Sequence, residues 1–122
     1  MADEITLSGT LRILKGDFDF SRKTGSISQT MTGDALIHNI QLIGDTHEAL
    51  QMGDVTVPGA FMFINLSEFT ITLGLDDVGS FVPFVAVPTG GYIMGSNLSL
   101  TAPYAKCSDS EGGYLEYVIG QI

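Results

Sequence analysis

The stretch from Gly53 to Lys106 decides the fold: GDVTVPGAFMFINLSEFTITLGLDDVGSFVPFVAVPTGGYIMGSNLSLTAPYAK. It consists of short runs rich in β-branched and aromatic residues, and each run ends at Gly, Pro, Asn or Asp, which is typical of strands separated by turns. The expected strands are Ala60–Leu66, Phe69–Leu75, Phe81–Val87, Tyr92–Met94 and Asn97–Lys106. This spacing predicts an all-β protein, a single-domain antiparallel β-sandwich of jelly-roll-like type over residues 1–122.

The N-terminal region continues the pattern of short strands. Residues 5–8 and 10–14 alternate apolar and polar side chains, which is the period of a half-buried strand. The segment Ser21–Gly25 reads as a turn, and a polar strand is expected from Ser26 to Thr32. These features predict an N-terminal hairpin through residues 21–25.

Two further strands flank the central stretch. Ala35 to Ile43 lacks a helical period and predicts a strand ending at Gly44-Asp45. Tyr114 to Ile119 predicts a final strand, preceded by a tight turn at Gly112-Gly113. Between them, Thr46 to Met52 is the best helical candidate, a single turn with Asp45 or Thr46 as N-cap.

The composition limits the classes of partner. Five basic and 14 acidic residues give a formal net charge of −9, which disfavours nucleic acid and anionic membranes as partners. Charged residues make up only 16% of the chain, below the usual ~25%, so exposed apolar groups must contribute to the surface. Such a surface either tolerates concentrated solution or is partly covered by partners.

The location is also constrained. Cys107 is the only cysteine, so an internal disulfide is impossible and a reducing site of folding is expected. The acidic N-terminus does not resemble a signal peptide, and no apolar run approaches the ~20 residues of a membrane span. Synthesis in the cytoplasm is the expectation.

Catalytic and metal sites find little support in the sequence. His38 and His47 are the only histidines and have no zinc-ligand spacing, so no catalytic residue, metal or cofactor is predicted. A nucleophilic pair of Cys107 with either histidine is conceivable, but no motif marks it.

Close pairs of carboxylates occur at three places: Asp17/Asp19, Asp76/Asp77 and Asp109/Glu111. Such pairs can bind calcium or hydrolyse glycosides, but solvated turns are the favoured interpretation and calcium stays open. The two sequons at Asn65 and Asn97 are most simply chance without a secretory signal.

The most apolar run, Phe81 to Val87, contains Pro83. Because proline cannot donate to a strand ladder, an edge position or a bulge is expected here. An apolar edge strand invites pairing with another chain, so we expect a subunit contact at or beside this strand, with Phe81, Val82 and Phe84 as the partner-binding residues.

Several of these segments together resemble small β-rich virion structural proteins of tailed bacteriophages. The resemblance covers about residues 32 to 119 and is carried by turn and strand segments: residues 32–44 (TGDALIHNIQLIG), 53–59 (GDVTVPG), 63–66 (FINL), 81–84 (FVPF) and 115–119 (LEYVI). No functional residue can be carried over from it. Members with assigned roles include head decoration (cement) proteins, and others sit in tails or necks.

The resemblance implies a non-enzymatic capsid decoration or cement protein located in the virion, on the capsid surface. Its partner would be the major capsid protein or other virion proteins, and a homo-oligomer, preferably a homotrimer, is expected. A tail, neck or baseplate component is the first alternative. A glycan-binding β-sandwich module is the second, with Tyr92, Tyr104 or Tyr114 stacking on sugar rings.

Overall fold

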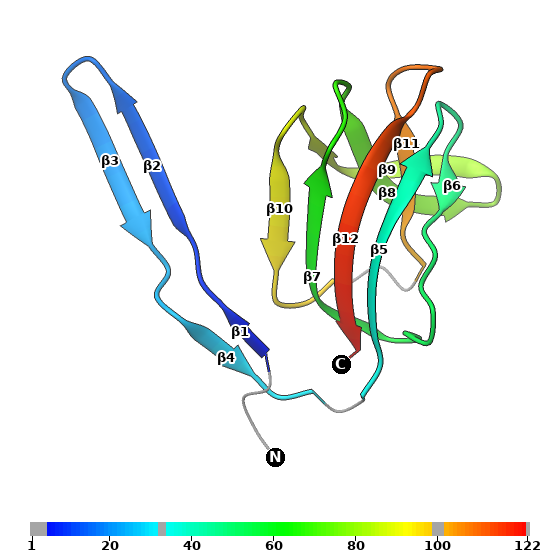
Figure 1. Cartoon of the computed structure of the whole chain (residues 1–122), viewed down its shortest axis with the longest axis horizontal. Helices are drawn as coiled ribbons and strands as arrows, with labels where there is room; N and C mark the ends of the chain where they lie inside the picture. The colour runs from blue at the N-terminus through cyan, green and yellow to red at the C-terminus, as the bar shows by residue number, and fades with distance from the viewer. Residues whose placement is uncertain (1–4, 32–33, 99–101, 122) are drawn as a thin grey trace. The chain divides into compact units, whose positions relative to one another are not determined.

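The computed structural model describes residues 5–31, 34–98 and 102–121, and it divides the chain into two compact units, residues 1–32 and 33–122 (Figure 1). Antiparallel strands form both units, and the described residues contain no helix. The all-β antiparallel sandwich predicted from the sequence is therefore confirmed. It occupies the second unit, whereas the prediction spread one sandwich over the whole chain.

The first unit is one long hairpin, named here the hairpin arm (residues 5–29). Strand β1 (Ile5–Leu7) pairs with β4 (Ile27–Gln29), and β2 (Thr10–Lys15) pairs with β3 (Phe18–Lys23). Gly16 has φ +58° in the two-residue turn between β2 and β3, a conformation that glycine adopts without cost.

The predicted position of this hairpin's turn was wrong. Residues 21–23 belong to β3 rather than to a turn, and the chain reverses at Gly16 and Asp17 instead. The Ser26–Thr32 segment contributes only the short β4 to a strand. A turn of only two residues, Gly16 and Asp17, leaves a short pattern in the sequence. The longer polar run at residues 21–25 therefore gives the stronger indication of a turn.

The second unit contains two four-stranded sheets, which appear as two layers in Figure 1. The first sheet has the order β10-β7-β12-β5, formed by β10 (Tyr92–Gly95), β7 (Pro58–Asn65), β12 (Gly113–Gln121) and β5 (Leu36–Ile43). The second has the order β6-β11-β8-β9, formed by β6 (Glu48–Ala49), β11 (Tyr104–Cys107), β8 (Ile71–Asp77) and β9 (Ser80–Val87). The jelly-roll-like connectivity stays a prediction.

The core lies between the two sheets. Alternate residues of the central strand β12, which are Leu115, Tyr117 and Ile119, are fully buried. They join Phe63 of β7 and residues such as Ile71 and Cys107 of the second sheet in one apolar cluster. Burial on this scale is the main force that holds two sheets together.

The sequence predicted the strands flanking the core well. Residues 35–43 and 114–119 were expected as strands and correspond to β5 and β12. Gly112 has φ +77° just before β12, in agreement with the expected turn.

Two other segments differ from expectation. The helical turn expected at Thr46–Met52 is wrong, because residues 48–49 form β6 and pair with Tyr104 and Ala105 of β11. Asn97–Lys106 is not a continuous strand among its described residues, since the strand there begins at Tyr104, and residues 99–101 lie outside the described part of the chain.

Strand β9 lies at the edge of the second sheet and carries a bulge, as Pro83 predicted. Leu73 of β8 pairs with Val85 and Gly74 pairs with Pro83, so Phe84 is the additional residue. The tight packing depends on Gly74, because a Cβ atom there would lie 2.1 Å from the carbonyl oxygen of Val82.

No helix of the described residues is long and apolar enough to cross a membrane.

Candidate functional site

The outward surface of the first sheet is apolar and exposed. In β5, Leu36, Ile40 and Leu42 alternate with inward residues and are 63%, 52% and 50% exposed. Neighbouring strands add apolar groups in register with them, so the patch spans the sheet. We name this patch the outer apolar face: Leu36, Ile40, Leu42, Met62, Ile64, Tyr92, Met94, Tyr114 and Val118.

One polar pair interrupts the outer apolar face. His38 Nε2 lies 2.8 Å from Glu116 Oε2, and the two side chains come from the adjacent strands β5 and β12. Glu116 therefore has a partner on the face itself. Surfaces this apolar are usually covered by another molecule.

The hairpin arm has a second apolar face. In the β2–β3 register, Ile13 is opposite Phe20, Leu11 is opposite Arg22 and Lys15 is opposite Phe18, and these six side chains share one side of the hairpin. We name Leu11, Ile13, Phe18 and Phe20 the arm face. All four are exposed, and none of the described residues 5–31 is buried.

The opposite side of the hairpin is more polar. Arg12 Nε lies 3.3 Å from Asp19 Oδ1, and both side chains are more than half exposed. Leu14 is the exception on this side. Arg12 thus lies on the side opposite the arm face and is paired with Asp19. The cations on the same side as the arm face are Lys15 and Arg22.

Charge is divided unequally between the two units. The first unit, residues 1–32, contains four basic and four acidic residues and is formally neutral. Within it, residues 10–23 contain all four basic residues and two of the acidic ones, so the formal net charge of that stretch is +2. Residues 34–121 contain ten acidic residues and one basic residue, Lys106, so their formal net charge is −9. Basic character is therefore concentrated on the hairpin arm.

Three exposed acids lie in loops that connect the two sheets at one end of the sandwich. Asp45 follows β5, Glu68 follows β7, and Glu111 precedes β12. The register brings these strand ends together, since Gly113 pairs with Ile43 and Leu115 with Asn65. We name Asp45, Glu68 and Glu111 the acidic rim.

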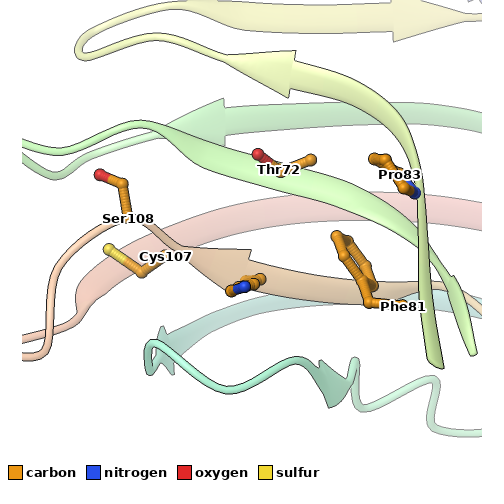
Figure 2. A pocket seen from close by; sticks show the side chains of 6 residues that line it. Thr72, Phe81, Pro83, Cys107 and Ser108 are labelled. Carbon is orange, nitrogen blue, oxygen red and sulfur yellow. The ribbon is translucent and has the colours of Figure 1, made fainter. Parts of the chain in front are cut away.

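The residues predicted to bind a partner lie on the edge strand β9. Val82 and Phe84 are 42% and 52% exposed, while Phe81 is half-buried. Phe81 and Pro83 line an open pocket of about 350 Å³ together with Thr72, Lys106, Cys107 and Ser108 (Figure 2). Within residues 5–31, 34–98 and 102–121, no strand pairs with the outer edge of β9, and this edge carries exposed apolar groups, the arrangement that strand addition requires.

A histidine–carboxylate pair lies near this strand. His47 Nε2 is 2.7 Å from Asp76 Oδ1, and the His47 ring stacks on Phe81 at 5.3 Å between centroids. The hydrogen bond from His47 is the largest cause and lowers the pKa of Asp76. Burial raises this pKa by less, and the backbone N–H of Gly79 adds a smaller decrease. Asp76 thereby joins His47 to the β8–β9 turn.

The interior polar groups are fully hydrogen-bonded. Asn65, 1% exposed, donates to the carbonyl oxygens of Phe69 and Val87 at 2.6 Å and 2.9 Å, and its Oδ1 accepts from the backbone N–H and the hydroxyl of Ser67. The Asn65 side chain of this sequon is therefore buried and serves as a structural hydrogen-bonding group of the fold. Ser99 of the second sequon lies outside the described residues.

Tyr117 is the other buried polar group of note. Its hydroxyl lies 2.7 Å from the carbonyl oxygen of Gln51 and accepts from Asn39 Nδ2 at 3.1 Å. Burial raises the pKa of Tyr117, and these hydrogen bonds offset part of the rise. The group fixes the loop after β6 against β12.

The predicted carboxylate pairs have local roles. Asp19 pairs with Arg12, and Asp109 Oδ2 accepts from the backbone N–H of Glu111 at 2.9 Å. In the described part of the chain, no three His, Cys, Asp or Glu side chains gather as metal ligands.

Cys107 is buried in the core, while His38 and His47 bond to Glu116 and Asp76. Among the described residues, neither histidine forms a hydrogen bond with Cys107.

The tyrosines considered for glycan stacking do not share one surface. Tyr92 and Tyr114 are exposed on the outer apolar face, whereas Tyr104 is half-buried beside His47 on the second sheet, with ring centroids 5.6 Å apart. Tyr92 and Tyr114 are therefore the exposed candidates for stacking, and the glycan-binding alternative stays a prediction.

Sequence reasoning identified β9 but missed both larger apolar faces. The signals were present, since Phe18 and Phe20 alternate with two aspartates, and Leu36, Ile40 and Leu42 have even spacing. Comparisons of the chain with protein-family models, curated proteins and solved structures found no match.

Proposed function

We propose that this chain is a non-enzymatic structural protein of a phage virion, and that it serves as a capsid decoration protein which bridges capsid subunits and stabilises the head. The observation that supports an assembly role is the extent of exposed apolar surface in an acidic β-sandwich, above all the outer apolar face. The assignment to a virion rests on the resemblance carried by residues 32–119.

In this proposal β9 docks on the major capsid protein. Its free edge offers backbone donors and acceptors, and Val82 and Phe84 offer apolar side chains on the same edge strand. Strand addition combines main-chain hydrogen bonds with side-chain pockets, which gives both affinity and specificity. The acidic remainder of the sandwich stays in solvent.

The experiment mixes the purified full chain with particles assembled from the major capsid protein encoded in the same genome. We expect cosedimentation at a fixed copy number and a higher temperature of capsid disruption. Phe84→Asp should abolish cosedimentation, while Thr89→Asp, which adds the same charge to the exposed turn after β9, should not. Unchanged binding of Phe84→Asp would refute the β9 contact, and no binding to heads would refute the decoration role.

A tail, neck or baseplate component is the second candidate, and the hairpin arm favours it. An extended arm with an apolar face can bridge neighbouring subunits within a ring. Labelled antibody located by electron microscopy on intact virions separates the two roles, since label on the tail would replace the decoration role with this one.

A further inference from the structure

Each chain carries two apolar surfaces that differ in charge. The arm face lies between Lys15 and Arg22 on a hairpin of formal net charge +2. The outer apolar face lies on a sandwich of formal net charge −9, and the acidic rim lies at one end of that sandwich. All four residues of the arm face are exposed in the single chain, and so are five of the nine residues of the outer apolar face; the other four are half-buried.

We propose that the arm face of one copy packs on the outer apolar face of a second copy, with Lys15 or Arg22 beside the acidic rim. The occupant of the sheet face is thus a second copy of this chain. The inference deepens the proposed function and rests on it only in taking assembly as the role of the protein.

Charge favours the contact between arm and sandwich over a contact between the outer apolar faces of two sandwiches. Two sandwiches packed through their outer apolar faces would bring together two bodies of net charge −9, and like charges oppose such a contact. Contact between arm and sandwich brings opposite charges together instead. It also covers both apolar surfaces in one step.

The dimensions of the two surfaces agree. Strands β2 and β3 have six residues each, about 20 Å in length at the usual strand rise. Strand β12 has nine residues, about 30 Å, so the hairpin fits within the length of the sheet.

Reciprocity favours a closed assembly. Because every chain has one arm face and one outer apolar face, each copy can give its arm to a neighbour and receive another. Such an interface gives a reciprocal dimer or a ring where its rotation closes and an open filament where it does not, and the expected homotrimer is one such ring.

The first experiment measures the mass of the full chain by light scattering over a concentration series. We expect a discrete oligomer whose dissociation constant rises at least tenfold for Phe20→Asp. The matched control is Ser21→Asp, which places the same charge on the opposite side of the same strand and should leave the mass unchanged. A monomer at all concentrations, or equal effects of the two variants, would overturn the proposal.

The second experiment applies the same logic to the sheet. Ile40→Asp should dissociate the oligomer, whereas Val78→Asp, at an exposed valine of the β8–β9 turn, should not. Circular dichroism of each variant monitors folding. If Ile40→Asp unfolds the chain, Ile40→Ser on the same strand repeats the test.

The third experiment distinguishes the second copy from the chain's own sandwich. A Phe20→Cys chain is mixed with an Ile40→Cys chain under mild oxidation, and we expect a disulfide-linked heterodimer. Ser21→Cys mixed with Ile40→Cys should give much less, and the unsubstituted chain, with Cys107 buried, should give none. No heterodimer, together with a rapid internal disulfide in a Phe20→Cys/Ile40→Cys double variant, would overturn the proposal.

The two proposals fail separately. A monomer that still binds phage heads would refute the arm exchange and leave the decoration role intact. An arm-exchanged oligomer that binds no virion part would do the opposite.

Discussion

The hairpin arm and the sandwich are built from the same alternation of side chains, yet only the sandwich has a core. In β12, Leu115, Tyr117 and Ile119 are 0% exposed, whereas no described residue of the arm is buried. The difference arises because β12 faces a second sheet, while the arm is a two-stranded ribbon with no second layer in its own unit. An isolated hairpin of this kind is marginally stable alone, so its apolar side chains suit a partner better than a core.

The strongest test of this contrast truncates one phenylalanine in each unit. Phe63→Ala removes a ring that is 1% exposed and should lower the free energy of unfolding by about 3–5 kcal/mol. Phe20→Ala removes a ring from the arm face and should change the stability of the monomer by no more than about 0.5 kcal/mol. Urea unfolding of both variants at low concentration gives the comparison, and equal losses would remove the distinction between core and arm.

A second test removes the polar group at the centre of the sandwich. Asn65→Ala removes a donor to the carbonyl oxygen of Val87 and the acceptor of the backbone N–H of Ser67, and should cost about 2–4 kcal/mol. Phe69 keeps the Ser67 hydroxyl as a donor at 2.9 Å. The arm has no buried counterpart, so Ser21→Ala on its exposed side is the control and should be neutral. Urea midpoints report both effects, and a loss below about 1 kcal/mol for Asn65→Ala would mean that water replaces the amide.

The fold was largely predictable wherever turn residues and alternation agree, as at β5, β9 and β12. The prediction failed at residues 46–52. There β6 pairs with β11 over only two residues, and that pairing depends on Tyr104 and Ala105, which lie far along the chain. Local propensity carries no information on such a contact.

The candidate surfaces were predictable in part. Pro83 alone indicated the edge and the bulge of β9, because its ring removes a donor wherever it stands. The outer apolar face was predictable only in part. The even spacing of Leu36, Ile40 and Leu42 places them on one side of β5, but β5 also carries isoleucine on its other side, and the sequence does not say which side meets the core. The structure shows that Ile37 and Ile43 pack on the core and that Leu36, Ile40 and Leu42 do not.

A third test compares the turns of the two units. Gly16 allows positive φ in the turn of the arm, but Val78, in the β8–β9 turn, has φ +51°, which is strained for a β-branched residue. Val78→Asn should therefore raise the free energy of unfolding by about 1 kcal/mol, because asparagine tolerates this conformation. Thermal unfolding checks the sign, and a lower melting temperature would mean that the valine makes a stabilising contact.

The smallest expected effect concerns pH and separates the His47–Asp76 pair of the sandwich from the Arg12–Asp19 pair of the arm. The hydrogen bond from His47 places the pKa of Asp76 below its ordinary 3.8, so the unfolded chain takes up this proton first as pH falls. The stability contributed by this pair is present above that pH and is lost as pH decreases through the lowered pKa of the folded state.

Asp76→Asn should accordingly flatten the decrease in melting temperature between pH 5 and 3, a range chosen around the ordinary carboxylate pKa of ~4. Asp19→Asn removes the exposed ion pair of the arm and should leave the curve of the wild-type chain unchanged. Parallel curves for all three proteins would show that the His47–Asp76 pair does not contribute.

The position of β12 has a consequence for synthesis. It pairs with both β5 and β7 at the centre of the first sheet, yet the ribosome makes both neighbours first. The two strands have no ladder with each other, so the sheet cannot close before residues 113–121 leave the exit tunnel. Until then the nascent chain presents the apolar sides of β5 and β7 to water. When many ribosomes translate one messenger RNA, the unpaired strands of neighbouring nascent chains can therefore pair with each other. This risk ends when β12 is released and pairs with β5 and β7 of its own chain.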